Sequence, residues 1–216
     1  MTEENRESFF KRLEPFLAPS VLLDVQLAYT MAKFSHRSQT RKEAGPDGEP
    51  LRYFEHVRRV AIILIDEARV AKAELVVAAL LHDGVEDTRD LTPAMIEHCF
   101  GADVATIVLT LSKVPKEGYI ERFEMCSDWR PYLIKACDRL DNLRSLGGSP
   151  EFRAKQVKET REKYYPLFER MLTLAPPEHA ARARHMRDLV LKETERQAAL
   201  MEVAEGFVKA VEDRLK

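Results

Sequence analysis

Apolar residues recur at helical spacing along almost the whole chain, and this leaves few folds open to it. They lie three and four positions apart over residues 20–35, 53–69 and 72–83, which is the spacing of one helix face. No stretch of alternating apolar and polar residues is long enough to indicate a strand. The sequence therefore predicts an all-α fold, built as a helical bundle.

Turn-forming residues punctuate the helical pattern. The segment Glu43–Pro50, EAGPDGEP, is a predicted loop. Thr92 can cap a short helix that ends at Gly101. Asp128 can cap a later helix, which we expect to end at Gly147 and the glycine after it.

The C-terminal part of the chain is predicted to be a helical extension. A helix over residues 151–174 should be kinked or interrupted at Pro166, and after two further prolines Glu178–Lys216 reads as one long helix or two. Its later part carries one apolar face, formed by Leu200, Ala204, Phe207, Val211 and Leu215. This spacing favours packing back onto the domain, and a contact with a second copy is the alternative. We therefore divide the chain into residues 1–175, the domain, and 176–216, the extension.

The balance of charges limits the partners of this chain. It has 34 Lys and Arg against 36 Asp and Glu, a formal net charge of −2, whereas proteins that coat nucleic acid usually carry a basic excess. We therefore expect no nucleic-acid partner, although this charge is compatible with a small basic pocket for a nucleotide.

No segment predicts a membrane span or a secretion signal. The longest apolar runs, Val60–Ile65 and Leu75–Leu81, are far shorter than the ~20 residues that cross a bilayer. The first ten residues, MTEENRESFF, are acidic and polar. The three cysteines are an odd number without close pairing, which indicates reduced thiols. We expect a cytoplasmic protein without a membrane partner.

The densest group of titratable residues is the segment LLHDGVEDT. An apolar helix ends there in His82 and Asp83, and Glu86 and Asp87 follow within about one turn. Buried without a positive partner, these charges would cost several kcal/mol. A divalent cation is the simplest explanation, because imidazole and carboxylate suit Zn, Fe and Mn. The alternative is a helix end that emerges into water.

Three further groups carry residues of related chemistry. His56 lies on the predicted helix 53–69. A polar stripe at i, i+4 and i+7 follows one face of a later helix and consists of Asp138, Asn142 and Ser145. A basic cluster precedes the predicted loop and consists of Arg37, Arg41 and Lys42. Each group alone is more often structural or solvent-facing. His56 and Asp138, taken together with His82 and Asp83, indicate a four-ligand site.

This arrangement resembles the HD superfamily of metal-dependent phosphohydrolases, which are all-α. A longer series of motifs resembles, more narrowly, the hydrolase domain of RelA/SpoT-type alarmone enzymes. In order, the motifs are Arg41-Lys42, a loop, an aromatic residue and His56, LLHDGVEDT, FGADV, KACDRLDNLRSL and ETREKYYPLFER. They span roughly Asp24 to Met171, and their order and spacing make the resemblance specific.

The resemblance implies a role for each matching residue. The implied metal ligands, for one manganese ion, are His56, His82, Asp83 and Asp138. The implied catalytic acids are Glu86 and Asp87. The implied substrate-binding residues are Arg41 and Lys42 at the phosphates, and Asn142 and Ser145 near the ribose and base.

Several positions depart from the usual pattern of that family. Gly84 stands where a larger residue is usual, Ser38 where glycine is usual, and Val57 where proline is common. Asp141 replaces a usual histidine or aromatic residue, and the loop after Lys42 is somewhat long. These changes leave the implied ligands and acids in place, but the loop and Asp141 bear on which base is accepted.

The function implied by the resemblance is hydrolysis of (p)ppGpp-like alarmones at the ribose 3′ position, giving pyrophosphate and GDP or GTP. One alternative is an HD nucleotide hydrolase with another substrate, such as (p)ppApp. Another is a non-catalytic nucleotide- or metal-binding regulator, which the presence of Glu86 and Asp87 disfavours. Since the length leaves no room for a synthetase domain, we expect a small stand-alone hydrolase that could form a homodimer through its C-terminal helix.

Overall fold

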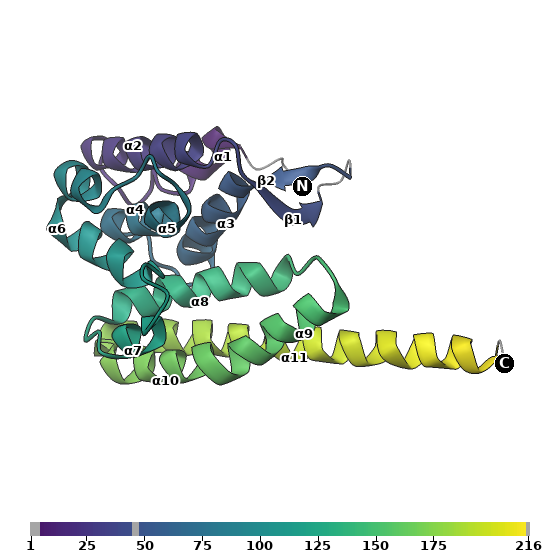
Figure 1. Ribbon diagram of the computed structural model, residues 1–216. Coiled ribbons are helices and arrows are strands. Elements are labelled where there is room, and N and C mark those ends of the chain that lie inside the picture. The colour runs from purple at the N-terminus through teal and green to yellow at the C-terminus, as the bar shows by residue number, and fades with distance from the viewer. Residues whose placement is uncertain (1–4, 45–47, 215–216) are drawn as a thin grey trace.

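The computed structural model describes residues 5–44 and 48–214 (Figure 1). Its elements are α1 Arg6–Lys11, α2 Pro19–Ser35, β1 Thr40–Ala44, β2 Pro50–Arg52, α3 Tyr53–Asp66, α4 Ala73–Leu81, α5 Gly84–Asp87, α6 Pro93–Leu111, α7 Tyr119–Glu124, α8 Trp129–Arg144, α9 Pro150–Glu159, the π-helix η1 Thr160–Tyr164, α10 Tyr165–Leu174 and α11 Pro177–Arg214. The predominance of helix confirms the predicted all-α class.

Helix α4 forms the centre of the N-terminal half. Every residue from Leu75 to Leu81 is buried, so the helix is apolar on all sides, as a core helix must be. It packs against α2, α3 and α6. Because the chain leaves this helix at His82, the polar residues that follow begin inside the core rather than at its surface.

Helix α8 lies between two groups of helices. It packs against α3, α4 and α6 on one side and against α10 and α11 on the other (Figure 1). Its apolar residues fill both interfaces, and its charged residues are buried with them. The buried charged residues of α8 are Lys135, Asp138, Arg139 and Asp141.

The expectation that the chain has no strands is wrong in one place. The segments β1 and β2 form an antiparallel hairpin around the predicted loop, with Thr40 opposite Arg52 and Ala44 opposite Pro50. The strands are short and mostly polar, TRKEA and PLR, so the alternation that identifies a strand is too brief to detect. The hairpin ends directly at the first turn of α3.

The predicted helix start at Thr92 is confirmed, and the break at Gly101 is confirmed with a difference. The Thr92 hydroxyl accepts a hydrogen bond from the backbone N–H of Met95. At Gly101 the backbone is non-helical, with φ of 86°, and a second helical segment follows at once. Among the described residues, α6 is the one helix long and apolar enough to cross a membrane. Its internal break and its packing on α4 fit a soluble protein.

The later helix boundaries follow the predictions closely. Asp128 caps α8 through the backbone N–H of Arg130, but α8 ends at Arg144, before the predicted glycines. The predicted interruption at Pro166 takes the form of the π-helix η1, which ends two residues before that proline.

Helix α11 is one long helix with two different environments. Its first half is part of the core, since Ala183, Met186 and Val190 are completely buried. Its second half extends beyond the other helices (Figure 1), where Leu200 is 51% and Phe207 71% exposed. The expectation that this later face packs back onto the domain is therefore wrong for the described residues, and Leu215 lies outside them. The division at residue 175 remains a prediction.

Candidate metal centre and adjoining cavity

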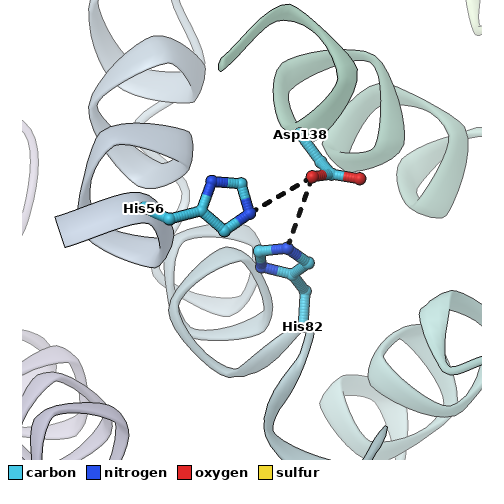
Figure 2. Close-up of side chains that lie close together, drawn as sticks. All are labelled: His56, His82 and Asp138. Carbon is cyan, nitrogen blue, oxygen red and sulfur yellow. Dashed lines mark ion pairs between the residues drawn. The ribbon is translucent and has the colours of Figure 1, made fainter. Parts of the chain in front are cut away.

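Three helices bring two histidines and an aspartate together (Figure 2). His56 lies in the first turn of α3, His82 follows the last residue of α4, and Asp138 lies in α8. One potential ligand atom from each lies within 4.8 Å of the others. All three residues are buried, each at most 3% exposed. These three residues, which the sequence assigned to a metal site, thus come together from distant parts of the chain.

The ring of His82 is oriented by its own helix. Its Nδ1 lies 2.8 Å from the carbonyl oxygen of Ala79, and because a carbonyl can only accept, the proton is on Nδ1. The Nε2 of His82 is buried and has no hydrogen-bond partner in the described part of the chain. It faces one oxygen of Asp83 at 3.1 Å and one of Asp138 at 3.9 Å. An imidazole nitrogen and two carboxylates that converge in this way are a donor set that suits a cation between them.

Asp83 supplies a second carboxylate beside the histidines. Its Oδ2 lies 3.1 Å from Nε2 of His82 and 3.5 Å from Nε2 of His56. The same oxygen accepts a hydrogen bond from the hydroxyl of Tyr53 at 2.7 Å. The structure therefore brings together all four residues that the sequence assigned to the metal.

Asp138 is held from two sides by residues of its own helix. Its Oδ2 lies 2.7 Å from the ammonium nitrogen of Lys135, and its Oδ1 accepts from the amide of Asn142 at 2.5 Å. Burial alone would raise the pKa of Asp138, but the charge of Lys135 and the hydrogen bond with His56 together outweigh burial and hold this pKa well below its usual range. Asp138 is therefore ionised, with Oδ1 directed at the histidines.

A third carboxylate lies on the far side of His56. The Nδ1 of His56 is 2.7 Å from Oδ2 of Asp141, and Asp141 is also ion-paired with Arg59. Burial would lower the pKa of His56, but the hydrogen bonds that its ring donates to Asp138, Asp141 and Asp83 outweigh burial and raise this pKa to about 10. The metal-free cluster thus keeps a proton on His56 in place of a cation.

The donor set of this cluster fits a divalent metal ion. Two imidazole nitrogens and two carboxylates converge on one buried point, and such mixed ligands suit first-row divalent metals. The unpartnered Nε2 of His82 is the observation that decides the fit. His56, His82, Asp83 and Asp138 are the residues that would hold the ion.

The two predicted catalytic acids lie in different surroundings. Asp87 lines the cavity beside the cluster, and its pKa is raised by burial and by the negative charge of Asp83. The carboxylate of Glu86 instead accepts from the backbone N–H of Lys113 at 3.1 Å and lies 3.4 Å from its ammonium nitrogen. The structure brings Asp87 to the cavity and ties Glu86 to Lys113.

A cavity of about 280 Å³ adjoins the cluster. Its wall carries charged side chains of both signs. The cationic ones are Arg41, Lys113, Lys135 and Arg139, and the acidic ones are Asp83, Asp87, Asp138 and Glu159. A second hollow, also about 280 Å³, continues from it, and the two share Arg41, Tyr53, Asn142, Phe152 and Gln156. Together they form a path from the cluster to an outer hollow whose charged lining residues are Arg41 and Lys42, and this positive charge suits an anionic ligand.

The predicted substrate-binding residues meet in the second hollow. Arg41, from the hairpin, donates to Oδ1 of Asn142 at 2.8 Å and to the hydroxyl of Ser145 at 3.3 Å. Lys42 also lines this hollow, and its ammonium nitrogen lies 4.1 Å from the centre of the Phe152 ring. These contacts close the hairpin onto the end of α8, so four residues that are distant in sequence form one wall.

Several residues around the cavity were not singled out from the sequence. They are Tyr53, Lys113, Lys135, Arg139, Phe152 and Gln156. A weak signal existed only for Lys135, a cation three residues before Asp138 on a helix with a strong apolar face. For the others, the place in the site depends on packing between helices, which the sequence pattern does not contain.

A family model for the HD domain matches residues 28–124. This range includes His56, His82 and Asp83 and ends before Asp138. The bifunctional (p)ppGpp synthase/hydrolase SpoT of Escherichia coli K12 is 35% identical in an alignment 178 residues long that covers 76% of this chain and 24% of that protein.

A second curated protein and a solved structure are also similar to this chain. The guanosine-3′,5′-bis(diphosphate) 3′-pyrophosphohydrolase of Aquifex aeolicus is 36% identical in an alignment 183 residues long that covers 79% of this chain and 25% of that protein. The chain thus spans about a quarter of the length of these curated relatives. A solved structure described as a metazoan ortholog of SpoT that hydrolyses ppGpp aligns with a TM-score of 0.58 and 28% identity, covering 79% of this chain and 95% of that one.

Proposed function

Since this chain belongs to the HD-domain family, we propose that it is a metal-dependent hydrolase that removes the 3′-pyrophosphate of (p)ppGpp-type alarmones and leaves GDP or GTP. The observation that carries this proposal is the buried His-Asp cluster beside a cavity with four cationic side chains in its wall. The relatives whose printed names specify this reaction support the choice of substrate.

The proposed metal is Mn²⁺, held by His56, His82, Asp83 and Asp138. A divalent ion at this position would activate water for attack and offset negative charge on the phosphoryl group. The protein contributes the geometry of the donors: the carbonyl of Ala79 orients the ring of His82, and the amide of Asn142 donates to Oδ1 of Asp138. Both supports act from within the helix that carries the ligand.

Asp87 is the proposed general base. It lines the cavity, and its raised pKa brings it closer to the operating range of a proton acceptor at neutral pH. Glu86 is proposed to act beside it, through its ion pair with Lys113, by holding that ammonium group at the cavity wall. Asp87 would then accept a proton, and Glu86 would hold the ammonium group of Lys113 in position.

The cationic wall is proposed to bind the phosphates. Arg41 and Lys42 keep their predicted role at the phosphate side, and Lys113 and Arg139 add positive charge near the cluster. Cations held in a partly enclosed cavity bind developing phosphate charge more strongly than cations in water. Asn142 and the residue Ser145 are proposed to contact the nucleoside in the second hollow.

The test is a direct turnover assay. The purified protein is incubated with Mn²⁺ and either ppGpp or ppApp, and the products are separated by chromatography. We expect ppGpp to give GDP and pyrophosphate. A preference for ppApp would support the mechanism and change the substrate, and no turnover of either nucleotide by metal-loaded protein would refute the proposal.

Variants of the two acids separate catalysis from metal binding. Asp87→Asn should lower turnover by about 10²–10⁴-fold, while bound Mn²⁺ remains stoichiometric. The double variant Glu86→Gln with Asp87→Asn should lose at least as much activity. Full turnover of the double variant with metal still bound would contradict the proposed roles.

We also propose that the free end of α11 binds a second copy of this chain. Leu200, Val203, Phe207 and Val211 are exposed on this projecting helix, and a hollow of about 320 Å³ between α9 and α11 continues this surface. The exposed residues follow a near-heptad spacing suited to pairing with an equal helix. Phe207→Glu should convert a dimer to a monomer in light scattering, and a parent protein that is monomeric at all concentrations would refute this proposal.

The proposed location is the cytoplasm.

A further inference from the structure

The imidazoles of the two histidines in the cluster are supported in different ways. His82 donates from Nδ1 to the neutral carbonyl of Ala79 at 2.8 Å. The Nδ1 of His56 instead meets a carboxylate, Oδ2 of Asp141, at 2.7 Å. Both rings therefore keep Nε2 for the centre of the cluster, but only one is supported by a full negative charge.

Asp141 is itself held in place by Arg59. The Nε of Arg59 lies 2.6 Å from Oδ1 of Asp141, and its Nη2 lies 3.1 Å from Oδ2. This is a two-point contact, which fixes the plane of a carboxylate better than a single hydrogen bond. Asp141 is 3% exposed, so water does not compete for its oxygens.

Position along the helices explains why the three residues meet. Arg59 lies three residues after His56 on α3, which puts both on neighbouring positions of one face. Asp141 lies three residues after Asp138 on α8, which packs against α3. One turn of α8 therefore supplies two carboxylates to His56, Asp138 toward Nε2 and Asp141 toward Nδ1.

We propose that Asp141, clamped by Arg59, is a positioning residue that makes His56 the stronger of the two histidine ligands. A carboxylate on Nδ1–H fixes the tautomer, prevents the ring from turning, and raises the electron density at Nε2. The carbonyl that supports His82 does the first two of these but adds no charge. The inference concerns metal affinity alone and is independent of the nucleotide that the enzyme hydrolyses.

The test measures metal binding without substrate. The dissociation constant for Mn²⁺ is obtained from the electron paramagnetic resonance signal of free Mn²⁺, and the absorption bands of bound Co²⁺ report the ligand geometry. Asp141→Asn should weaken Mn²⁺ binding by about 10–100-fold and shift the Co²⁺ bands. Arg59→Met should weaken binding by a smaller factor, because the carboxylate remains but its orientation is lost.

Asp66→Asn is the matched control. Asp66 also lies on α3 and pairs with an arginine, Arg12, at 2.9 Å, but ten residues of helix, about 15 Å, separate it from His56. This variant should bind Mn²⁺ as the parent does. Equal losses in Asp66→Asn and Asp141→Asn would mean that any broken ion pair on α3 disturbs the cluster, and would overturn the proposal.

A background without the ligand distinguishes positioning from general damage. In His56→Ala, adding Asp141→Asn should cause no further loss of Mn²⁺ affinity, because Asp141 acts only through the His56 ring. A further loss of tenfold, or an Asp141→Asn single variant that binds within twofold of the parent, would refute the inference. If Asp141→Asn does not fold, Arg59→Met in both backgrounds gives the same comparison. A parent that binds neither Mn²⁺ nor Co²⁺ would overturn the metal site itself.

Discussion

Replacing Lys135 with methionine should lower the stability of the metal-free protein and raise its affinity for metal. Lys135 is 2% exposed, and its ammonium nitrogen lies 2.7 Å from Asp138. Burial alone would lower the pKa of Lys135, but the charge of Asp138 and smaller contributions from neighbouring acidic groups together outweigh burial and hold this pKa well above its ordinary value. The residue is therefore a fixed positive charge within the cluster. Methionine keeps most of the apolar stem and removes that charge.

The size of the stability loss follows from the burial of the pair. Removing one partner of a buried ion pair costs about 3–5 kcal/mol, because the other charge stays buried and uncompensated. In a chain of this size each kcal/mol shifts the melting temperature by about 2–4 °C. The metal-free Lys135→Met protein should therefore melt about 6–20 °C below the parent.

Metal binding should change in the opposite direction. Lys135 is a positive charge at a ligand carboxylate, and it repels a second cation at the same carboxylate by a few kcal/mol at an effective dielectric constant of about 20. Its removal should tighten Mn²⁺ binding at least about tenfold. Thermal melts in chelator and in Mn²⁺, with a Mn²⁺ titration, measure both effects on the same samples.

Lys113→Met is the control for this experiment. Lys113 pairs with Glu86 at 3.4 Å, and its side chain is 32% exposed, so its loss should cost no more than about 1 kcal/mol. The reasoning fails if, in chelator, the melting temperature of Lys135→Met equals that of the parent. It also fails if this variant binds Mn²⁺ more weakly, since that result would mean that Lys135 shapes the site rather than competing with the ion.

Three further predictions concern the cluster and its surroundings. His82→Ala should abolish the rise in melting temperature that Mn²⁺ gives the parent. In the parent, Mn²⁺ at a hundred times its dissociation constant should add about 2.7 kcal/mol to the free energy of unfolding. Because the pKa of His56 is raised to about 10 and only neutral imidazole binds metal, Mn²⁺ affinity should rise about tenfold per pH unit between pH 6.5 and 8.5 in calorimetric titrations. A pH-independent affinity would contradict this. Gly84→Ala would place its Cβ 2.4 Å from Cδ1 of Leu91, which is 4% exposed, and should cost about 1–3 kcal/mol in urea unfolding; an unchanged midpoint would show that Leu91 moves freely.

The convergence of the four residues of the proposed metal site could be predicted because their signals are local or depend on order. His82 and Asp83 end an apolar helix, where charge is costly without a cation, and Asp138 belongs to a polar stripe at helical spacing. The order of these motifs, with His56 on the preceding helix, indicated one shared site. In the structure, each of the four residues lies on, or directly after, the helix that was predicted to carry it.

Lys135 and Asp141 could not be assigned a place in the same way. Both are charged residues on α8, and their burial depends on packing between helices. Asp141 is buried against His56 and Arg59 of α3, and Lys135 lies near the ring of Tyr164. A sequence pattern gives the face of a helix but not the number of neighbours that cover it. The free end of α11 shows the converse, because the apolar face with Phe207 has no partner within the described residues.

The separation of the ligands along the chain has a consequence for unfolding. His56 and Asp138 are 138 − 56 = 82 positions apart, and an ion bound by both closes that length of chain into a loop, as a disulfide would. Cross-links of this span reduce the entropy of the unfolded chain by an amount worth about 4–5 kcal/mol in the disulfide case. The ion would also have to leave before α3 and α8 could separate. Loaded protein should therefore unfold at a rate set by metal release, and proteolysis in Mn²⁺ should slow in step with the ion's dissociation.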